Sequence, residues 1–187
     1  MKKQFLHLSI LTLLTTAVFT ACKKEKGESN EEEVITTMQL TLTPHDGSTP
    51  LVYKFEDADG PGGAAPSIDQ IVLASSETYD VALQLLNKTV NPAEDITEEI
   101  EEEADAHRFY FEPAAGSNIT ISGLDKDGNG VDLGVNSTWT TGAAATGSIT
   151  ITLRHYPAEP PNKAAGDAVN SQKSGTDIEA TFTTKIQ

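Results

Sequence analysis

Apolar and polar residues alternate along most of this chain with a period of two. Side chains of a β-strand point alternately to its two faces, so each alternating run predicts a strand with one buried and one solvated face. The apolar positions of these runs are Val34, Met38, Leu40 and Leu42; Tyr53 and Phe55; Tyr79, Val81, Leu83 and Leu85; Phe109 and Phe111; Ile119 and Ile121; Ile149, Ile151 and Leu153; and Ile178, Ala180 and Phe182.

Turn-forming clusters separate the runs, among them His45-Asp46-Gly47 and the segments 59–63 and 125–130. Short alternating strands with this punctuation predict an all-β fold, an antiparallel immunoglobulin-like β-sandwich over residues 34–187. Neither a cysteine pair nor a tryptophan at the centre of a predicted strand marks a true immunoglobulin domain. The strand order therefore stays open.

One segment departs from the period of two and predicts a short inserted helix. Asp95 followed by Glu98 fits a capping box, and Ile96, Ile100 and Ala104 then lie on one helical stripe. We expect a helix over residues 96–106, laid across the sandwich. Residues 157–175 contain Pro, Ala and Ser without periodicity and predict a long loop before the last strand.

The N-terminus predicts export. Lys2 and Lys3 precede an apolar run from Phe5 to Phe19, which is too short to span a bilayer permanently. The sequence Phe19-Thr20-Ala21-Cys22 resembles a bacterial lipobox, in which the cysteine is lipidated and becomes the new N-terminus. Residues 1–21 are thus predicted to be a lipoprotein signal peptide, with Cys22 as the lipid anchor in a membrane. The alternative is an ordinary signal peptide that happens to contain a cysteine.

The segment after Cys22 and the overall charge indicate how the domain is attached and which partners it does not bind. Residues 22–33 contain no side chain suited to a core and predict a flexible acidic tether. A formal charge of -15 argues against binding to nucleic acid or to anionic membrane surfaces, which need clustered Lys and Arg. The acidic residues after Cys22 resemble the export signal of Bacteroidetes surface lipoproteins, and this resemblance implies an outer-membrane location, with the domain facing the periplasm or the cell surface.

The predicted helix carries candidate metal ligands. Glu99, Glu103 and His107 are spaced four residues apart and would share a face if the helix reached His107. His155 and Asp177 could complete the site if the fold brings them close. The alternative is a solvated acidic face with His107 at the helix end, where a cation is favoured.

A second candidate would bind calcium. Asp125, Asp127 and Asn129 precede Gly130 at the spacing of the first half of an EF-hand loop, but Asn136 stands where that loop has a bidentate Glu. A tight hairpin turn explains the same residues without an ion. The cofactor expected at these two sites is therefore a divalent metal ion, zinc or calcium.

Catalytic motifs give no support for an enzyme. The only cysteine belongs to the lipobox, and the chain has no Gly-x-Ser-x-Gly, no phosphate-binding Gly-rich loop and no His-Glu-x-x-His. Carboxylates are so abundant that pairs carry little meaning. We therefore expect a non-enzymatic protein.

Several segments together resemble a family of small Bacteroidetes envelope lipoproteins. They are the lipobox, Glu33-Val34-Ile35-Thr36-Thr37, the segment from Asp95 to His107, Leu153-Arg154-His155 and Thr176-Asp177-Ile178-Glu179. Some members are associated with TonB-dependent receptors, so the resemblance implies capture of a nutrient or metal beside such a receptor. We expect a module that binds a ligand or a partner. The alternative is a structural or adhesive surface lipoprotein with no small ligand.

Overall fold

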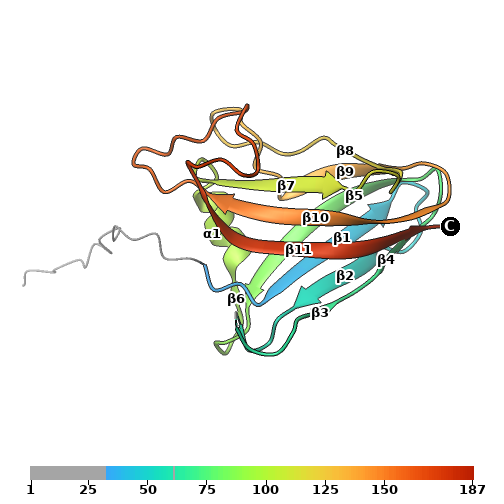
Figure 1. Cartoon of the computed structure of the whole chain (residues 1–187), viewed down its shortest axis with the longest axis horizontal. Coiled ribbons are helices and arrows are strands. Elements are labelled where there is room, and N and C mark those ends of the chain that lie inside the picture. Colours follow the sequence, from blue (N-terminus) through green and yellow to red (C-terminus); the bar gives the residue numbers. More distant parts are fainter. Residues whose placement is uncertain (1–32, 61) are drawn as a thin grey trace, which may run out of the picture.

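Two β-sheets packed face to face form the folded part of the chain (Figure 1). The computed structural model describes residues 33–60 and 62–187, so the predicted signal peptide, Cys22 and nearly all of the tether lie outside the described residues. The fold is the predicted all-β sandwich with one short helix. Within the described residues, no helix is long and apolar enough to cross a membrane.

The larger sheet, sheet A, has seven strands and the smaller, sheet B, has four. Sheet A follows the order β3 (Ser67–Ile68), β2 (Leu51–Glu56), β1 (Thr37–Pro44), β5 (Thr78–Asn87), β9 (Asn136–Thr141) and β8 (Ile119–Ser122), and β6 (Glu94–Asp95) pairs with the end of β5. Sheet B follows the order β4 (Ile71–Leu73), β11 (Gly175–Ile186), β10 (Ala145–His155) and β7 (His107–Pro113).

The hydrophobic core lies between the sheets and contains the apolar positions that the alternation selects. Burial alternates along β5 and β11, as expected for strands with one face on a core. The fully buried members include Met38, Leu40, Leu42 and Leu85 in sheet A, and Phe109, Ile149, Ile151, Leu153 and Phe182 in sheet B. The hydrophobic contact between these two inner faces stabilises the sandwich.

Three details of the strands differ from the sequence prediction. The sheets are not purely antiparallel, because β4 runs parallel to β11. Val34 is exposed and lies before β1, and its neighbour Ile35 is buried instead. Trp139 lies within β9 and is fully buried, in a strand that the pattern missed because Trp139 is its only large apolar residue.

The helix α1 (Ile96–Glu102) is shorter than predicted. Asp95 caps it as expected, its side chain accepting a hydrogen bond from the Thr97 N–H, and Ile96 and Ile100 are buried. The helix ends before Glu103 because the next residues join sheet B, where β7 pairs with β10 from His107 onward. Pairing and burial of the strand thus override the helical pattern of residues 103–106.

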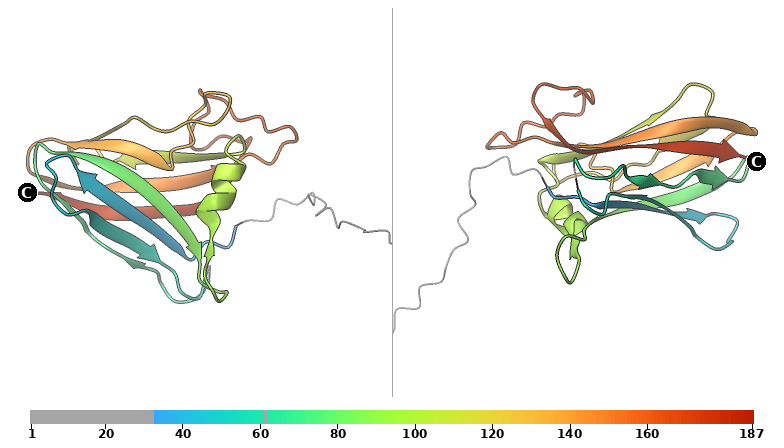
Figure 2. Two further views of the ribbon diagram at one scale, coloured as in Figure 1. Left: turned by 180° about the vertical axis from the view of Figure 1, so that it is seen from behind. Right: turned by 60° about the horizontal axis from the view of Figure 1, so that its bottom comes forward.

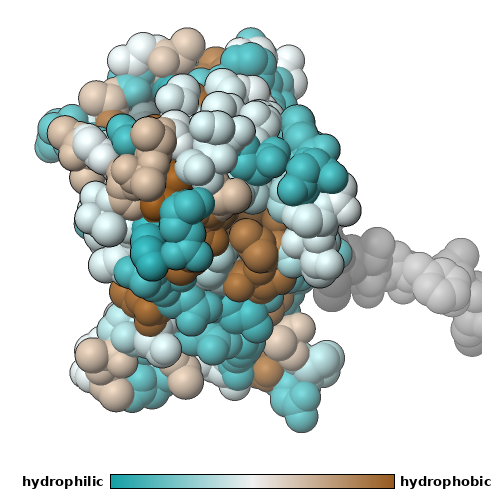
Figure 3. Space-filling model, turned by 90° about the vertical axis from the view of Figure 1, so that its right-hand side faces the viewer, coloured by the Kyte–Doolittle hydropathy of each residue, from teal (hydrophilic) through white to brown (hydrophobic). Residues whose placement is uncertain are grey.

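The two ends of the sandwich differ. Helix α1, the start of β7, the end of β10 and the start of β11 meet at one end, and the C-terminus lies at the other (Figures 1 and 2). Seen from the C-terminal side, the hydrophobic areas of the surface are interrupted by hydrophilic residues (Figure 3). The residues with metal-binding chemistry lie at the end that carries α1.

Candidate metal centre

His107, His155 and Asp177 come together where three neighbouring strands of sheet B meet at one end. One ligand atom from each residue lies within 4.8 Å of the corresponding atoms of the other two. His107 is the first residue of β7 and pairs directly with His155, the last residue of β10. Asp177 lies near the start of β11. Within the described residues, this is the only group of three or more His, Cys, Asp or Glu side chains so close together.

A β-bulge accounts for the position of Asp177. Leu153 pairs with Ile178 and Arg154 pairs with Thr176, so Asp177 is the additional residue of β11 at this point. His107 and His155 follow the alternation that buries Phe109 and Leu153, whereas an unbulged β11 would direct Asp177 to the opposite face from Ile178. Because a bulge changes the direction of a side chain, Asp177 can join the two histidines.

His107 is held in a form suited to binding a metal. Its side chain is completely buried, and burial lowers the pKa of His107 to about 4, so the ring is neutral. Nδ1 lies 3.1 Å from the carbonyl oxygen of Glu103, which can only accept, so Nδ1 carries the proton. Nε2 then has a free lone pair, and this buried atom has no hydrogen-bond partner. Metal-binding histidines are oriented in this way, with the other ring nitrogen bonded to a carbonyl.

His155 is half-buried and stacks on His107. The ring centroids are 4.7 Å apart and the ring planes differ by 19°. Burial lowers the pKa of His155, and the nearby charge of Glu103 opposes this effect. The lone pairs of stacked rings lie in nearly parallel planes, so a shared ion requires one ring to turn. The Glu103 carbonyl and complete burial fix His107, which leaves the rotation to His155.

The donor set defines the ions that this site suits. Two imidazole nitrogens and one carboxylate oxygen are typical ligands of zinc and of other divalent transition metals. Calcium takes six to eight oxygen ligands instead. The site therefore fits the zinc expectation and not the calcium one.

The expected helical ligands Glu99 and Glu103 do not join this group. Both side chains are exposed, and α1 ends at Glu102, so Glu99, Glu103 and His107 do not share a helical face. Glu103 contributes its backbone carbonyl to His107 rather than its carboxylate. Of the five residues proposed from the sequence, His107, His155 and Asp177 are the three that converge.

The expected calcium ligands have other partners. The Asp125 Oδ1 accepts hydrogen bonds from the Gly134 and Asn136 N–H groups. The Asp127 Oδ1 accepts from the Asn129 and Val131 N–H groups, and its Oδ2 lies 2.9 Å from the Lys163 Nζ. The lysine ammonium therefore takes the place beside Asp127 that calcium would need, and the loop corresponds to the hairpin-turn alternative.

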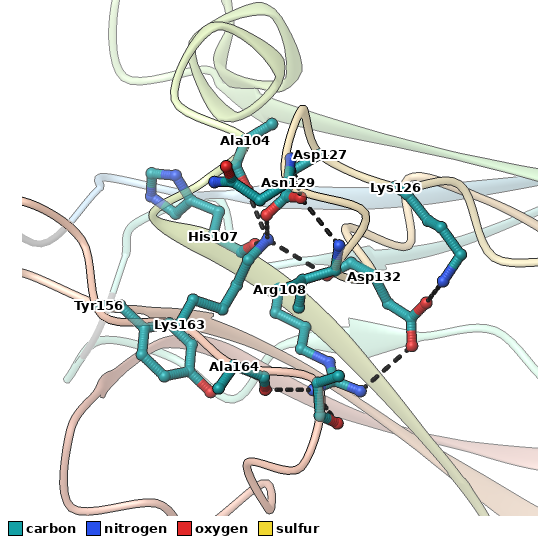
Figure 4. A network of polar contacts seen from close by, with 12 residues as sticks. Ala104, His107, Arg108, Lys126, Asp127, Asn129, Asp132, Tyr156, Lys163 and Ala164 are labelled. Atoms are coloured by element: carbon teal, nitrogen blue, oxygen red, sulfur yellow. Dashed lines mark hydrogen bonds and ion pairs between the residues drawn. The ribbon is translucent and has the colours of Figure 1, made fainter.

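Lys163 is the residue that sequence reasoning missed. Its Nζ donates to the carbonyl oxygens of Ala104, His107 and Asp132 and forms the ion pair with Asp127 (Figure 4). Both side chains of the ion pair are 1% exposed. Lys163 thereby connects loop 157–174 to the end of α1 and to the backbone of His107. Its position in an aperiodic loop gave no sequence signal for burial.

Two surface depressions lie away from these residues. Both are on the outer face of sheet A, each with a volume of about 350 Å³, and they share Ala82 and Asn136 in their linings. Asp95 borders one of them, but its carboxylate accepts hydrogen bonds from the Thr97 N–H and the Gln84 amide. The histidine cluster is therefore the strongest candidate site.

Comparison with known proteins gives no match. Neither a family model, nor a curated protein, nor a solved structure shows significant similarity to this chain.

Proposed function

We propose that this protein is a lipid-anchored, non-enzymatic envelope protein that captures a divalent transition-metal ion at His107, His155 and Asp177. The observation that carries the proposal is the buried, unpartnered Nε2 of His107, which lies within 4.8 Å of ligand atoms of His155 and Asp177. Leaving a buried polar atom without a partner costs about 1–3 kcal/mol, and a bound ion would remove that cost.

The proposed anchor and partner follow from the N-terminal sequence and its resemblance to envelope lipoproteins. Lipid on Cys22 would hold the protein at the outer membrane, and the acidic tether 22–33 would separate the sandwich from the lipid. A TonB-dependent receptor in the same membrane is the proposed recipient of the ion. Loss of membrane association in Cys22→Ser and co-purification of the wild type with such a receptor test these two points.

Thermal unfolding tests the metal site. The full chain in mild detergent is stripped with a chelator and unfolded alone and with added Zn²⁺, Co²⁺ or Ca²⁺. A ligand that binds only the native state stabilises it by about 2.7 kcal/mol at 100 times its Kd, which raises Tm by several degrees. We expect this shift with Zn²⁺ and Co²⁺ and none with Ca²⁺.

Variants identify the ligands. His155→Ala and Asp177→Asn are preferred because both residues are partly exposed, whereas replacing the buried His107 could prevent folding. Each should abolish the shift. His45→Ala is the matched control, since His45 pairs with Asp80 on the surface outside the cluster. An unchanged Tm with every ion would overturn the metal function and favour a structural or adhesive role.

A further inference from the structure

Three protein ligands leave the candidate metal centre incomplete. Structural zinc sites are almost always closed by four protein ligands, whereas sites with three keep a position for an exchangeable ligand. Here, within the described residues, only His107, His155 and Asp177 converge. The coordination shell of a bound ion thus needs at least one donor from outside this group.

The burial of the ligands indicates where that donor enters. His107 is completely buried, while His155 and Asp177 are each partly exposed. The buried imidazole closes the inner side of the site, so the open coordination position faces solvent beside His155 and Asp177. A solute can reach this side without any opening of the core.

Carboxylates surround the same end of the sandwich. Glu99 on α1 and Glu103 at the end of α1 are exposed, and the backbone carbonyl of Glu103 lies 3.1 Å from the His107 Nδ1. This local negative field, on a chain with a net charge of -15, attracts a divalent cation and repels anions. An incoming fourth ligand is therefore selected for being neutral or cationic.

We propose that the metal ion is held here as a ternary complex with a small neutral nitrogen donor from solution, of the imidazole or amine class, in the open position. This inference rests on the proposed metal-binding function. It specifies that the protein binds the metal ion together with a nitrogen ligand. Nitrogen donors suit the same borderline ions as the two histidines. Their neutrality avoids the repulsion that an anionic chelator would meet at Glu99 and Glu103.

Electron paramagnetic resonance of the Cu²⁺-loaded full chain tests the coordination directly. The Cys22→Ser background removes the lipid and the only cysteine sulfur, and nitrogen hyperfine structure counts the bound imidazoles. We expect two nitrogens from the protein and a third on addition of imidazole. His155→Ala should reduce the protein count to one, while His45→Ala should leave it at two.

Visible absorption of the Co²⁺-loaded chain tests the selectivity. Imidazole should change the spectrum at a concentration at least about tenfold lower than azide, because the carboxylates repel the anion. The double variant Glu99→Gln, Glu103→Gln should bring the two concentrations closer together. The single variant Glu103→Gln tests whether the Glu103 carboxylate occupies the fourth coordination position of the ion.

The outcomes separate this inference from the proposed function. Failure of Zn²⁺, Co²⁺ and Cu²⁺ to bind overturns both. Binding through His155 with no response to imidazole overturns the ternary complex alone. A response to imidazole that appears only in Glu103→Gln shows that Glu103 is the fourth ligand and also overturns it. A response to azide that equals the response to imidazole overturns the selectivity for neutral donors.

Discussion

The Nζ of Lys163 lies 2.9 Å from the Oδ2 of Asp127, and both side chains are almost completely excluded from solvent. Burial alone raises the pKa of Asp127, but hydrogen bonds from Lys163 and two backbone N–H groups bring it below its ordinary value. Burial lowers the pKa of Lys163, and Asp127 opposes this effect. The ion pair thus connects two loops and the backbone of His107. Each partner stabilises the charged form of the other.

Removing one partner of this ion pair should destabilise the fold strongly. Lys163→Met leaves a buried carboxylate without its cation, and such changes cost about 3–5 kcal/mol in the free energy of unfolding. Urea unfolding measures the loss. Lys173→Met is the control, because its ion pair with Asp167 is partly exposed and should contribute at most about 1 kcal/mol.

A double variant distinguishes the ion pair from simple packing. Asp127→Asn in the Lys163→Met background removes the uncompensated charge, so the double variant should lose less stability than the sum of the two single variants. We expect a coupling of about 0.5–3 kcal/mol. Strict additivity would show that the two charges do not interact energetically.

Trp139 should report on the core. It is the only tryptophan of the chain, it is fully buried, and its Nε1 donates to the Ser137 Oγ while Phe111 packs against its ring at a steep angle. Its fluorescence should shift to longer wavelength in the same transition that abolishes the far-ultraviolet circular dichroism of the sheets. Separate transitions would contradict a single cooperative core.

Trp139→Ala should cost about 3–5 kcal/mol, because it leaves a cavity between the two sheets. Circular dichroism during urea unfolding measures this value without the fluorophore. Val52→Ala, at an exposed position of the same sheet, should change stability by no more than about 0.5 kcal/mol.

Glu33 should make stability fall as pH rises. Burial, followed by the charges of Glu99, Glu103 and Glu94, raises the pKa of Glu33 from 4.5 to about 7. Between these values the native state binds more protons than the unfolded state, so the free energy of unfolding decreases with pH. Glu33→Gln should therefore stabilise the protein at pH 8 and leave it unchanged near pH 4.

Urea unfolding across this pH range checks the expectation, with Glu112→Gln as a control on an exposed carboxylate of β7. A pH dependence that persists unchanged in Glu33→Gln would assign the effect to other groups.

Replacing Glu99 tests whether this residue is a metal ligand, as the sequence predicts, or not, as the structure indicates. The spacing of Glu99 from Glu103 and His107 predicts a ligand. In the structure, Glu99 lies outside the group formed by His107, His155 and Asp177. Glu99→Gln should change the Kd for Zn²⁺ by less than about threefold at physiological salt, where exposed charges are screened. Isothermal titration calorimetry measures this, and His155→Ala should abolish binding in the same assay. A loss in Glu99→Gln equal to that in His155→Ala would restore Glu99 as a ligand.

The sequence by itself determined the sandwich, most of its strands, the capped helix and the residue types of the candidate metal site. Alternation of apolar and polar residues is a local property, and so is the cap at Asp95, which the structure confirms. Local patterns fail to predict the structure where the conformation of a residue depends on segments that are distant in sequence. The helix ends early because β7 pairs with β10, and the alternation missed β9 because Trp139 is the only large apolar residue of that strand.

Only the tertiary structure decided which of the candidate residues meet. His107 and His155 are brought together by strand pairing, and Asp177 is added by a bulge that exists only in the register of β10 with β11. The ammonium group of buried Lys163 contacts four oxygens from two segments, residues 104–107 and 127–132. Spacing along the chain encodes none of these contacts, because each depends on segments far apart in sequence that pack together to bury the core.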